Sequence, residues 1–164
     1  MKKIFIIILS LFLSSTLMAA GSDSSSGSSS SMDESLYEDA VKLVKRAGKL
    51  EKKDKIDKAK KLYAQAFNKL EKAYKSDKKN PDILNYMGFT SRKVGNFDQA
   101  EKFYLKGLNI KPNHNGINEY LGELYVQTNR INKANERLEV LKSCNCKEYG
   151  ELELIIKTRG SKVY

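Results

Sequence analysis

The fold is decided by residues 81–114, which read PDILNYMGFTSRKVGNFDQAEKFYLKGLNIKPNH. Shifting the chain against itself by 34 residues aligns residues of the same kind: Tyr86 with Tyr120, Gly88 with Gly122 and Ala100 with Ala134. Apolar positions coincide as well, so the match extends beyond these identities. A fixed period of this length is typical of proteins built from repeated structural units.

The repeated unit predicts a helix, a turn and a second helix. Asn80 and Pro81 are typical of a helix start, because an asparagine side chain can cap the first turn and proline suits the first helical position. Asn96 followed by Gln99 resembles a capping box, which predicts the start of the second helix. Pro112 is expected to end that helix, because proline cannot continue it.

Two units of the chain resemble tetratricopeptide repeats. In the first unit the matching residues are Leu84, Met87, Gly88, Ala100, Tyr104, Gly107 and Pro112. In the second unit they are Leu121, Gly122, Tyr125, Ala134, Leu138 and Leu141. An earlier unit fits the same template: Leu43, Ala47, Leu50, Ile56, Ala59, Tyr63 and Ala66. It starts 41 residues before the second unit. The seven extra residues equal about two helical turns, which predicts a longer second helix and not a loop.

The resemblance implies an all-α fold, a right-handed α-solenoid of about three helix-turn-helix repeats. The repeats would lie within residues 33–146, at about 40–80, 81–114 and 115–146. Residues 147–164 are expected to form a capping helix and a tail, since a stack needs an end with one polar face. The fold class and the domain organisation are predicted together by this pattern.

The start of the chain is typical of a protein that is exported. Residues 1–21 combine a cationic beginning, a short apolar core and a small-residue end, which predicts a secretory signal peptide. An uncleaved membrane anchor is the alternative, because the apolar stretch can be extended toward spanning length. Residues 22–32 are rich in serine and are expected to be a flexible linker. The exported protein would work in a bacterial-type periplasm, or outside the cell.

Composition and charge restrict the function. The chain has 164 residues, a formal net charge of +10 and a single histidine, which leaves little material for imidazole catalysis or a multi-histidine metal site. Residues 42–79 contain 15 basic and 5 acidic side chains, so the excess positive charge lies in the first repeat. This surface could contact an anionic envelope weakly, or it could be the ordinary solvated face of a helix. A nucleic-acid partner is not expected, since no recognition motif is present.

The resemblance also implies where a ligand binds, because the first helices of stacked repeats line a concave groove that holds a peptide or a helix. The residues placed at the groove are Asn85, Phe89, Arg92, Lys93, Glu119, Glu123 and Gln127. The inward positions of the first repeat are Val41, Val44 and Gly48, so the groove is expected to be apolar there, cationic in the middle and anionic at the far end. These side chains could also be merely solvated.

The clamp by which some members of this family hold the C-terminal carboxylate of a chaperone is not expected here. Its positions are occupied by side chains of the wrong chemistry: Val44, Gly48, Tyr86, Gly116 and Tyr120. Cys144 and Cys146 lie between the last repeat and the cap, and in an oxidising compartment they are expected to form a disulfide that holds the cap.

The leading hypothesis is an adaptor that binds a protein or peptide partner, with no enzymatic activity, no cofactor and no metal. No serine nucleophile motif, phosphate loop or argued carboxylate pair is found in the sequence. Two alternatives stay open. One is a thiol-disulfide accessory protein that uses Cys144 and Cys146, and the other is a structural protein held against the envelope by its basic first repeat.

Overall fold

The computed structural model describes the backbone of residues 26–160 and the side chains of residues 35–160. The described chain forms seven helices in succession: α1 (Ser26–Glu51), α2 (Ile56–Ser76), α3 (Pro81–Lys93), α4 (Phe97–Ile110), α5 (Asn115–Gln127), α6 (Ile131–Leu141) and α7 (Lys147–Lys157). No strand occurs in this part of the chain, so the prediction of an all-α fold is confirmed. The predicted signal peptide, residues 1–21, lies outside the described residues.

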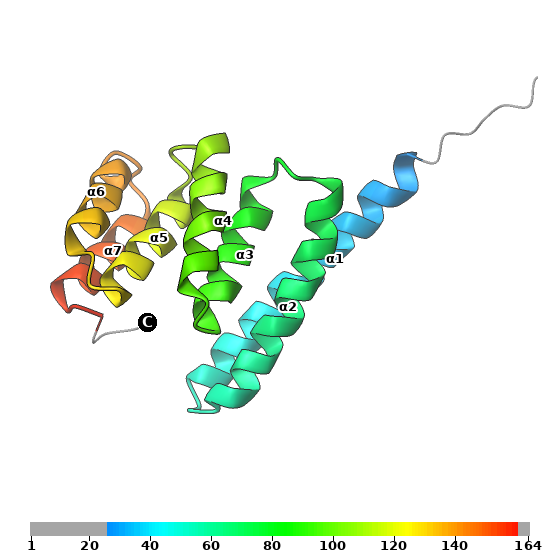
Figure 1. The fold of residues 1–164 in the computed structure, drawn as a ribbon, viewed down its shortest axis with the longest axis horizontal. Coiled ribbons are helices and arrows are strands. Elements are labelled where there is room, and N and C mark those ends of the chain that lie inside the picture. The colour runs from blue at the N-terminus through cyan, green and yellow to red at the C-terminus, as the bar shows by residue number, and fades with distance from the viewer. Residues whose placement is uncertain (1–25, 161–164) are drawn as a thin grey trace, which may run out of the picture.

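Consecutive helices pair into three antiparallel hairpins that stack side by side, with α7 closing the end against α5 and α6 (Figure 1). The first hairpin is the longest, because α2 has 21 residues whereas α4 has 14 and α6 has 11. The insertion in the first unit is therefore accommodated as additional helix. The tip of this hairpin and the first turns of α1 project beyond the rest of the stack (Figure 1).

The prediction of a flexible linker over residues 22–32 is wrong for its second part, because α1 begins at Ser26. The serine-rich residues from 26 onward continue a helix whose later turns pack against α2. Adding a residue to an existing helix avoids the cost of nucleation, and serine is only a moderately poor helix former. The remaining residues of the predicted linker, 22–25, lie outside the described part of the chain.

Glycines at the helix crossings set how closely the hairpins approach. A Cβ atom at Gly88 would lie 2.5 Å from Cε1 of Tyr104, whose ring is fully buried between α3 and α4. A Cβ atom at Gly122 would lie 2.5 Å from Cδ2 of Leu152 on α7. Real Cβ atoms do not approach that closely, so the repeated glycine of the 34-residue unit is a packing requirement.

The two asparagines expected to start helices behave differently. Asn80 precedes α3 with an extended backbone, φ −83° and ψ 110°, and its side chain accepts hydrogen bonds from the amides of Asp82 and Ile83. Asn96 precedes α4 with φ −85° and ψ 69°, and its side chain makes no capping bond. The capping-box prediction at Asn96 is therefore wrong, because the backbone there does not adopt the extended conformation that directs a capping side chain toward the first turn.

This difference predicts unequal effects of the same substitution. Asn80→Ala should lower the free energy of unfolding by about 1 kcal/mol, the usual cost of losing a helix cap. Asn96→Ala is the matched control and should change it by no more than a few tenths of a kcal/mol, since no bond is lost. Urea unfolding of both variants measures the difference; equal destabilisation would show that Asn80 does not act as a cap.

Candidate functional site

The concave side of the stack contains a cavity of about 640 Å³ that we call the aromatic cavity. All three hairpins and the cap contribute to its lining: Val44, Gly48, Glu51, Lys52, Ile56, Tyr63, Phe89, Arg92, Lys93, Tyr120, Glu123, Lys147 and Glu151. A second cavity, also of about 640 Å³, adjoins it, and we call it the polar cavity. The two cavities share Tyr120 and Lys147, so together they form one groove.

Three aromatic rings form one wall of the aromatic cavity. The ring of Phe89 lies 5.8 Å from that of Tyr63 and 4.9 Å from that of Tyr120, in edge-to-face and tilted arrangements. The three rings come from α2, α3 and α5, so the wall forms only when the hairpins stack. Burial raises the pKa of both tyrosines above the ordinary value, and their hydroxyls stay neutral at physiological pH.

Two ion pairs lie beside these rings. Nη2 of Arg92 lies 2.7 Å from Oε2 of Glu123, and both side chains are almost fully buried. Burial is the largest single influence on Arg92 and disfavours its charged form. The Glu123 carboxylate and the Tyr104 hydroxyl together outweigh burial, so the pKa of Arg92 is raised above its ordinary value. Nζ of Lys93 lies 2.7 Å from Oε2 of Glu51, which also accepts a hydrogen bond from the hydroxyl of Tyr63.

These pairs correct the expected distribution of charge along the groove. The middle is not a free cationic surface, because Glu51 and Glu123 lie next to Lys93 and Arg92. The end formed by the first repeat is not purely apolar either, since Glu51 on α1 lines it together with Val44. The charges pair across neighbouring hairpins, and sequence position alone does not show which side chains meet.

The polar cavity lies next to the start of α3 and α5. Its lining is mainly polar: Tyr37, Asp82, Asn85, Tyr86, Lys111, Asn113, His114, Asn115, Gly116, Glu119, Tyr120, Lys147 and Glu148. His114 caps α5, because its Nδ1 accepts a hydrogen bond from the amide of Ile117. Its other ring nitrogen, Nε2, lies 3.0 Å from Oδ1 of Asp82. These contacts match a neutral imidazole that donates from Nε2 to the carboxylate.

The structure brings six of the seven predicted groove residues to this surface. Phe89, Arg92, Lys93 and Glu123 line the aromatic cavity, and Asn85 and Glu119 line the polar cavity. Gln127 is exposed at the last turn of α5 and lines neither cavity, so its placement in the groove stays a prediction.

Sequence reasoning missed several residues that line the groove or support it. Tyr120 was considered only as a position of the chaperone-tail clamp. As the repeat equivalent of Tyr86, next to Glu119, it could also have been placed among the groove residues. The capping role of His114 could also have been found, since His114 lies one 34-residue period after Asn80. Lys147 carried no such signal, because it reaches the groove only when α7 folds back onto α5.

Cys144 and Cys146 are joined in the structure, with their Cα atoms 5.2 Å apart, and Cys146 directly precedes α7. The role of this bond as a clip for the cap stays a prediction. Within residues 35–160 no group of three or more His, Cys, Asp or Glu side chains is arranged to hold a metal ion. Among the described helices none combines the length and apolar character that crossing a bilayer requires.

No protein-family model matches the sequence, and no curated protein is significantly similar to it. Solved structures are similar in fold. The Arabidopsis OM64 TPR domain has a TM-score of 0.48 and 16% identity, covering 75% of this chain and 98% of that domain. The described part of this chain is, by its own helices, a stack of three helical hairpins closed by α7.

Two further solved structures have the same type of fold. The first TPR of Spaghetti (RPAP3), bound to the HSP90 peptide SRMEEVD, has a TM-score of 0.46 and 20% identity, covering 74% of this chain and 94% of that one. The Yersinia enterocolitica type III secretion chaperone SycD, in complex with a peptide of the translocator YopD, has a TM-score of 0.46 and 16% identity. It covers 73% of this chain and 87% of that one, and the likeness concerns the fold alone.

Proposed function

We propose that this protein is an exported adaptor that binds a segment of a protein partner in its concave groove. The observation that carries the proposal is the wall formed by Tyr63, Phe89 and Tyr120 in a cavity lined by all three hairpins and the cap. Apolar walls with a few fixed polar groups are typical of binding cavities, and a volume of several hundred Å³ accommodates a large side chain with its neighbours.

The charged side chains of the aromatic cavity support a binding role, because they lie against its aromatic wall. Glu51 and Glu123, two carboxylates that line the aromatic cavity, are held by Lys93 and Arg92. The same pairs fix the positions of Phe89 and Tyr120, because the Arg92 guanidinium lies 5.5 Å and 5.8 Å from the centres of those rings.

Export to the periplasm is part of the proposal and rests on the sequence of residues 1–21. N-terminal sequencing of the protein from its native cell envelope tests it. We expect the mature chain to start near Ser22. Recovery of an intact Met1 would contradict both cleavage and release from the membrane.

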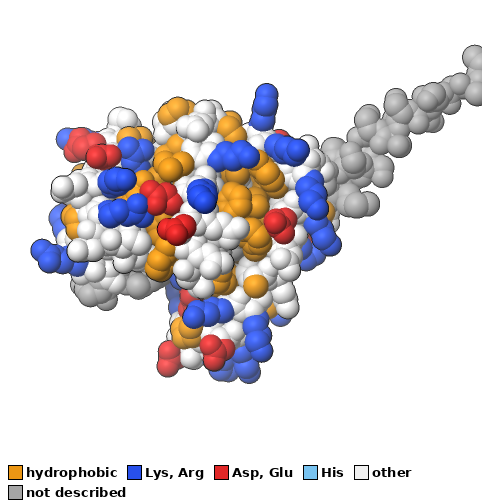
Figure 2. Space-filling model, in the orientation of Figure 1, with side chains coloured by type: hydrophobic (Ala, Val, Ile, Leu, Met, Phe, Trp, Pro, Cys, Tyr) orange, Lys and Arg blue, Asp and Glu red, His pale blue; other side chains and the backbone are white. Residues whose placement is uncertain are grey.

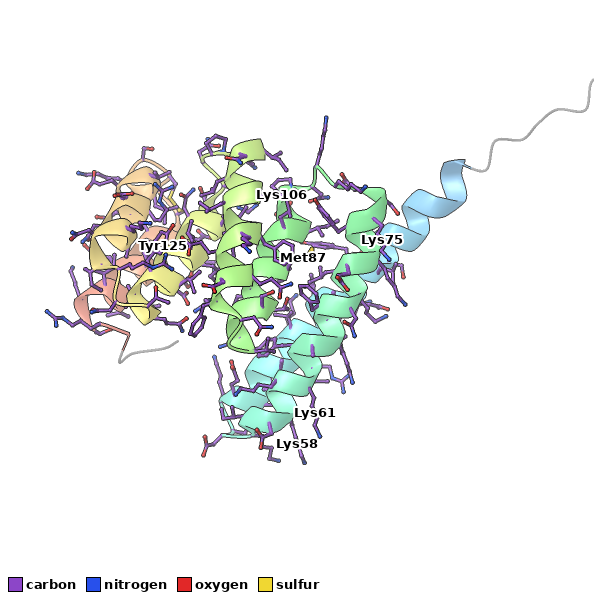
Figure 3. All side chains as sticks on the ribbon, in the orientation of Figure 1. Lys58, Lys61, Lys75, Met87, Lys106 and Tyr125 are labelled. Atoms are coloured by element: carbon purple, nitrogen blue, oxygen red, sulfur yellow. A yellow bond between two sulfur atoms is a disulfide. The ribbon has the colours of Figure 1, made fainter. Side chains whose placement is uncertain are left out.

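The basic first hairpin is proposed to have a secondary, non-specific role. Lys and Arg side chains gather along the edge and tip formed by α1 and α2, and Lys58, Lys61 and Lys75 extend along α2 (Figures 2 and 3). Exposed lysines can attract an anionic surface, but they do not fix the orientation of a ligand. We therefore assign ligand binding to the groove and weak envelope contact to this hairpin.

Peptide binding distinguishes these roles. A library of random linear peptides of about 12 residues, which reach about 40 Å when extended, is screened for binding to the full-length protein. The affinities of the peptides that bind are then measured at low and high salt. Phe89→Ala should weaken binding by about 1–2 kcal/mol at both salt concentrations, because the ring is a central apolar contact. Reversal of Lys60, Lys61 and Lys72 to Glu should slow association without abolishing the complex.

Phe97→Ala is the matched control, since Phe97 lies at the start of α4 outside both cavities. It should leave peptide affinity unchanged. If the lysine reversals abolish binding while Phe89→Ala has no effect, the basic hairpin is the functional surface and the groove proposal is wrong.

A further inference from the structure

The positive charge of the first hairpin is left almost uncompensated within the described chain. Residues 42–79 contain 15 basic side chains, and of these only Lys42 and Lys69 form an ion pair with a described residue. In the later repeats, by contrast, Arg92 and Arg130 are each held by a glutamate. Exposed charges without a partner inside the protein attract an external one of opposite sign.

This charge is concentrated at the tip of the hairpin, which we define as residues 45–61. The tip contains the last turns of α1, the connecting loop and the first turns of α2, with nine basic and three acidic side chains. All nine basic side chains are exposed, whereas one of the acidic ones, Glu51, is already bound by Lys93 and Tyr63. Because the tip extends beyond the neighbouring repeats, a flat surface can reach it ahead of them (Figure 1).

The basic side chains surround the tip and do not follow a single face of a helix. Lys58 and Lys60 lie on opposite flanks of the buried Ala59, since successive helical residues are about 100° apart. Eight of the nine basic residues are lysines, and Arg46 is the exception. Lysine carries a compact charge on a flexible stem and does not fix a partner as the planar arginine group does. Such a distribution suits a surface that presents many negative charges in no fixed register.

An apolar side chain lies among these lysines. Ile56 begins α2 at the tip, between Lys55 and Lys58, and 41% of its surface is exposed. Lysine stems can lie along an apolar phase while their ammonium groups stay in water. Protein segments that rest on anionic bilayers combine these features, because burial of apolar area and attraction to anionic lipids add.

We propose that the tip docks on an anionic lipid bilayer, with Ile56 at the level of the headgroups and the surrounding lysines against lipid phosphates. This inference rests on the envelope contact proposed for the first hairpin and narrows it to one element and one partner. Each basic residue close to an anionic leaflet strengthens binding about fivefold. Lys52 and Ile56 also line the aromatic cavity, so docking by the tip places that cavity next to the bilayer.

Vesicle binding tests the role of charge. The affinity of the protein purified from its native cells is measured for vesicles of equal parts phosphatidylglycerol and phosphatidylcholine, and for vesicles of phosphatidylcholine alone. The ratio of the two affinities is the readout. Changing Lys53, Lys55 and Lys58 together to Glu should lower this ratio about a hundredfold, because three attractive charges are lost. None of the three lines either cavity, so peptide binding should stay unchanged.

The matched control makes the same charge change at the other end of α2. Lys72, Lys75 and Lys78 are changed together to Glu; Figure 3 shows Lys75 at the opposite end of the helix from Lys58. Lys72 lies about 20 Å from Lys58 along the helix, whereas charges are screened over about 8 Å at physiological ionic strength. The control should lower the affinity ratio by no more than about threefold.

A fluorescent probe tests the depth of the tip. The sequence contains no Trp, so a single introduced Trp reports its own surroundings. Emission from Ile56→Trp should move to shorter wavelength when anionic vesicles are added, because the ring enters the headgroup region, where Trp is favoured. Leu105→Trp is the control: Leu105 is 44% exposed on α4, outside the tip, and its replacement should show no shift.

The possible outcomes separate this inference from the other proposals. Equal losses in the two triple variants would show that net charge alone attracts the bilayer, so the tip inference is wrong while the proposed envelope contact stands. No preference for anionic vesicles would contradict both. Tip-dependent binding to polyglutamate without binding to vesicles would identify an acidic polymer as the partner and overturn the lipid assignment. An unchanged Ile56→Trp emission on vesicle-bound protein would overturn the placement of Ile56. The groove proposal is tested separately, because peptide binding is measured without vesicles.

Discussion

Gly88→Leu is expected to unfold the middle repeat. A side chain at position 88 would place Cβ 2.5 Å from the ring of Tyr104, which is fully buried and cannot move aside without separating α3 from α4. Overpacking of a close helix crossing costs about 3 kcal/mol, at the upper end of its usual range, and a domain of this size has only about 5–15 kcal/mol of stability. Urea and thermal unfolding should both show the loss.

Gly150→Leu provides a matched control on α7. A Cβ atom at Gly150 has no heavy atom within 4 Å apart from its own helix backbone and neighbours, and the residue is exposed. The same substitution there should keep or raise stability, because leucine is a better helix former than glycine. Equal midpoints for the wild type and Gly88→Leu would show that the 34-residue register is misplaced.

Arg92→Ala should also be strongly destabilising. The substitution removes the guanidinium that lies 2.7 Å from Glu123, a carboxylate that is only 7% exposed. Removing one member of a buried ion pair costs about 3–5 kcal/mol, because the remaining charge loses its compensation. Arg46→Ala is the control, since Arg46 is exposed on α1 and forms no ion pair with another described residue. Its effect should be within about 0.5 kcal/mol.

A double substitution identifies the cause of the Arg92→Ala effect. Replacing Arg92 with Met and Glu123 with Leu removes both charges and should restore most of the lost stability, as buried pairs are often replaceable by apolar residues. Unfolding free energies of the two single variants and the double variant form a cycle that measures the coupling. Additive losses in that cycle would contradict the assignment of the pair as a buried, mutually compensating unit.

Much of the fold could be predicted because its determinants are local or periodic. The 34-residue shift aligns Gly88 with Gly122, and both positions prove to be close crossings where a Cβ atom would clash. The first hairpin was also predictable, because an apolar stripe continues through the extra residues of α2. The start of α1 was not, since helix propagation into serines depends on a helix already stabilised by packing.

The groove was only partly predictable. Helical periodicity places Phe89 and Arg92 on the concave side, but it does not reveal which charges meet across hairpins. The pair between Glu51 and Lys93 joins residues 42 positions apart and depends on the stacking of α1 against α3. Lys147 belongs to the groove only because α7 folds back. Such contacts are set by tertiary geometry and leave no local pattern in the sequence.

The measurement that tests the central claim most directly is photocrosslinking in cells that naturally make the protein. Benzoylphenylalanine replaces Phe89 in the groove, or Phe97 outside it as the control, and the joined partner and its linked segment are identified by mass spectrometry. We expect one partner segment crosslinked from position 89 and not from position 97. Two results would contradict the claim that the groove holds the ligand. One is equal crosslinking from positions 89 and 97. The other is no crosslinking from position 89 while benzoylphenylalanine in place of Lys61 captures a partner.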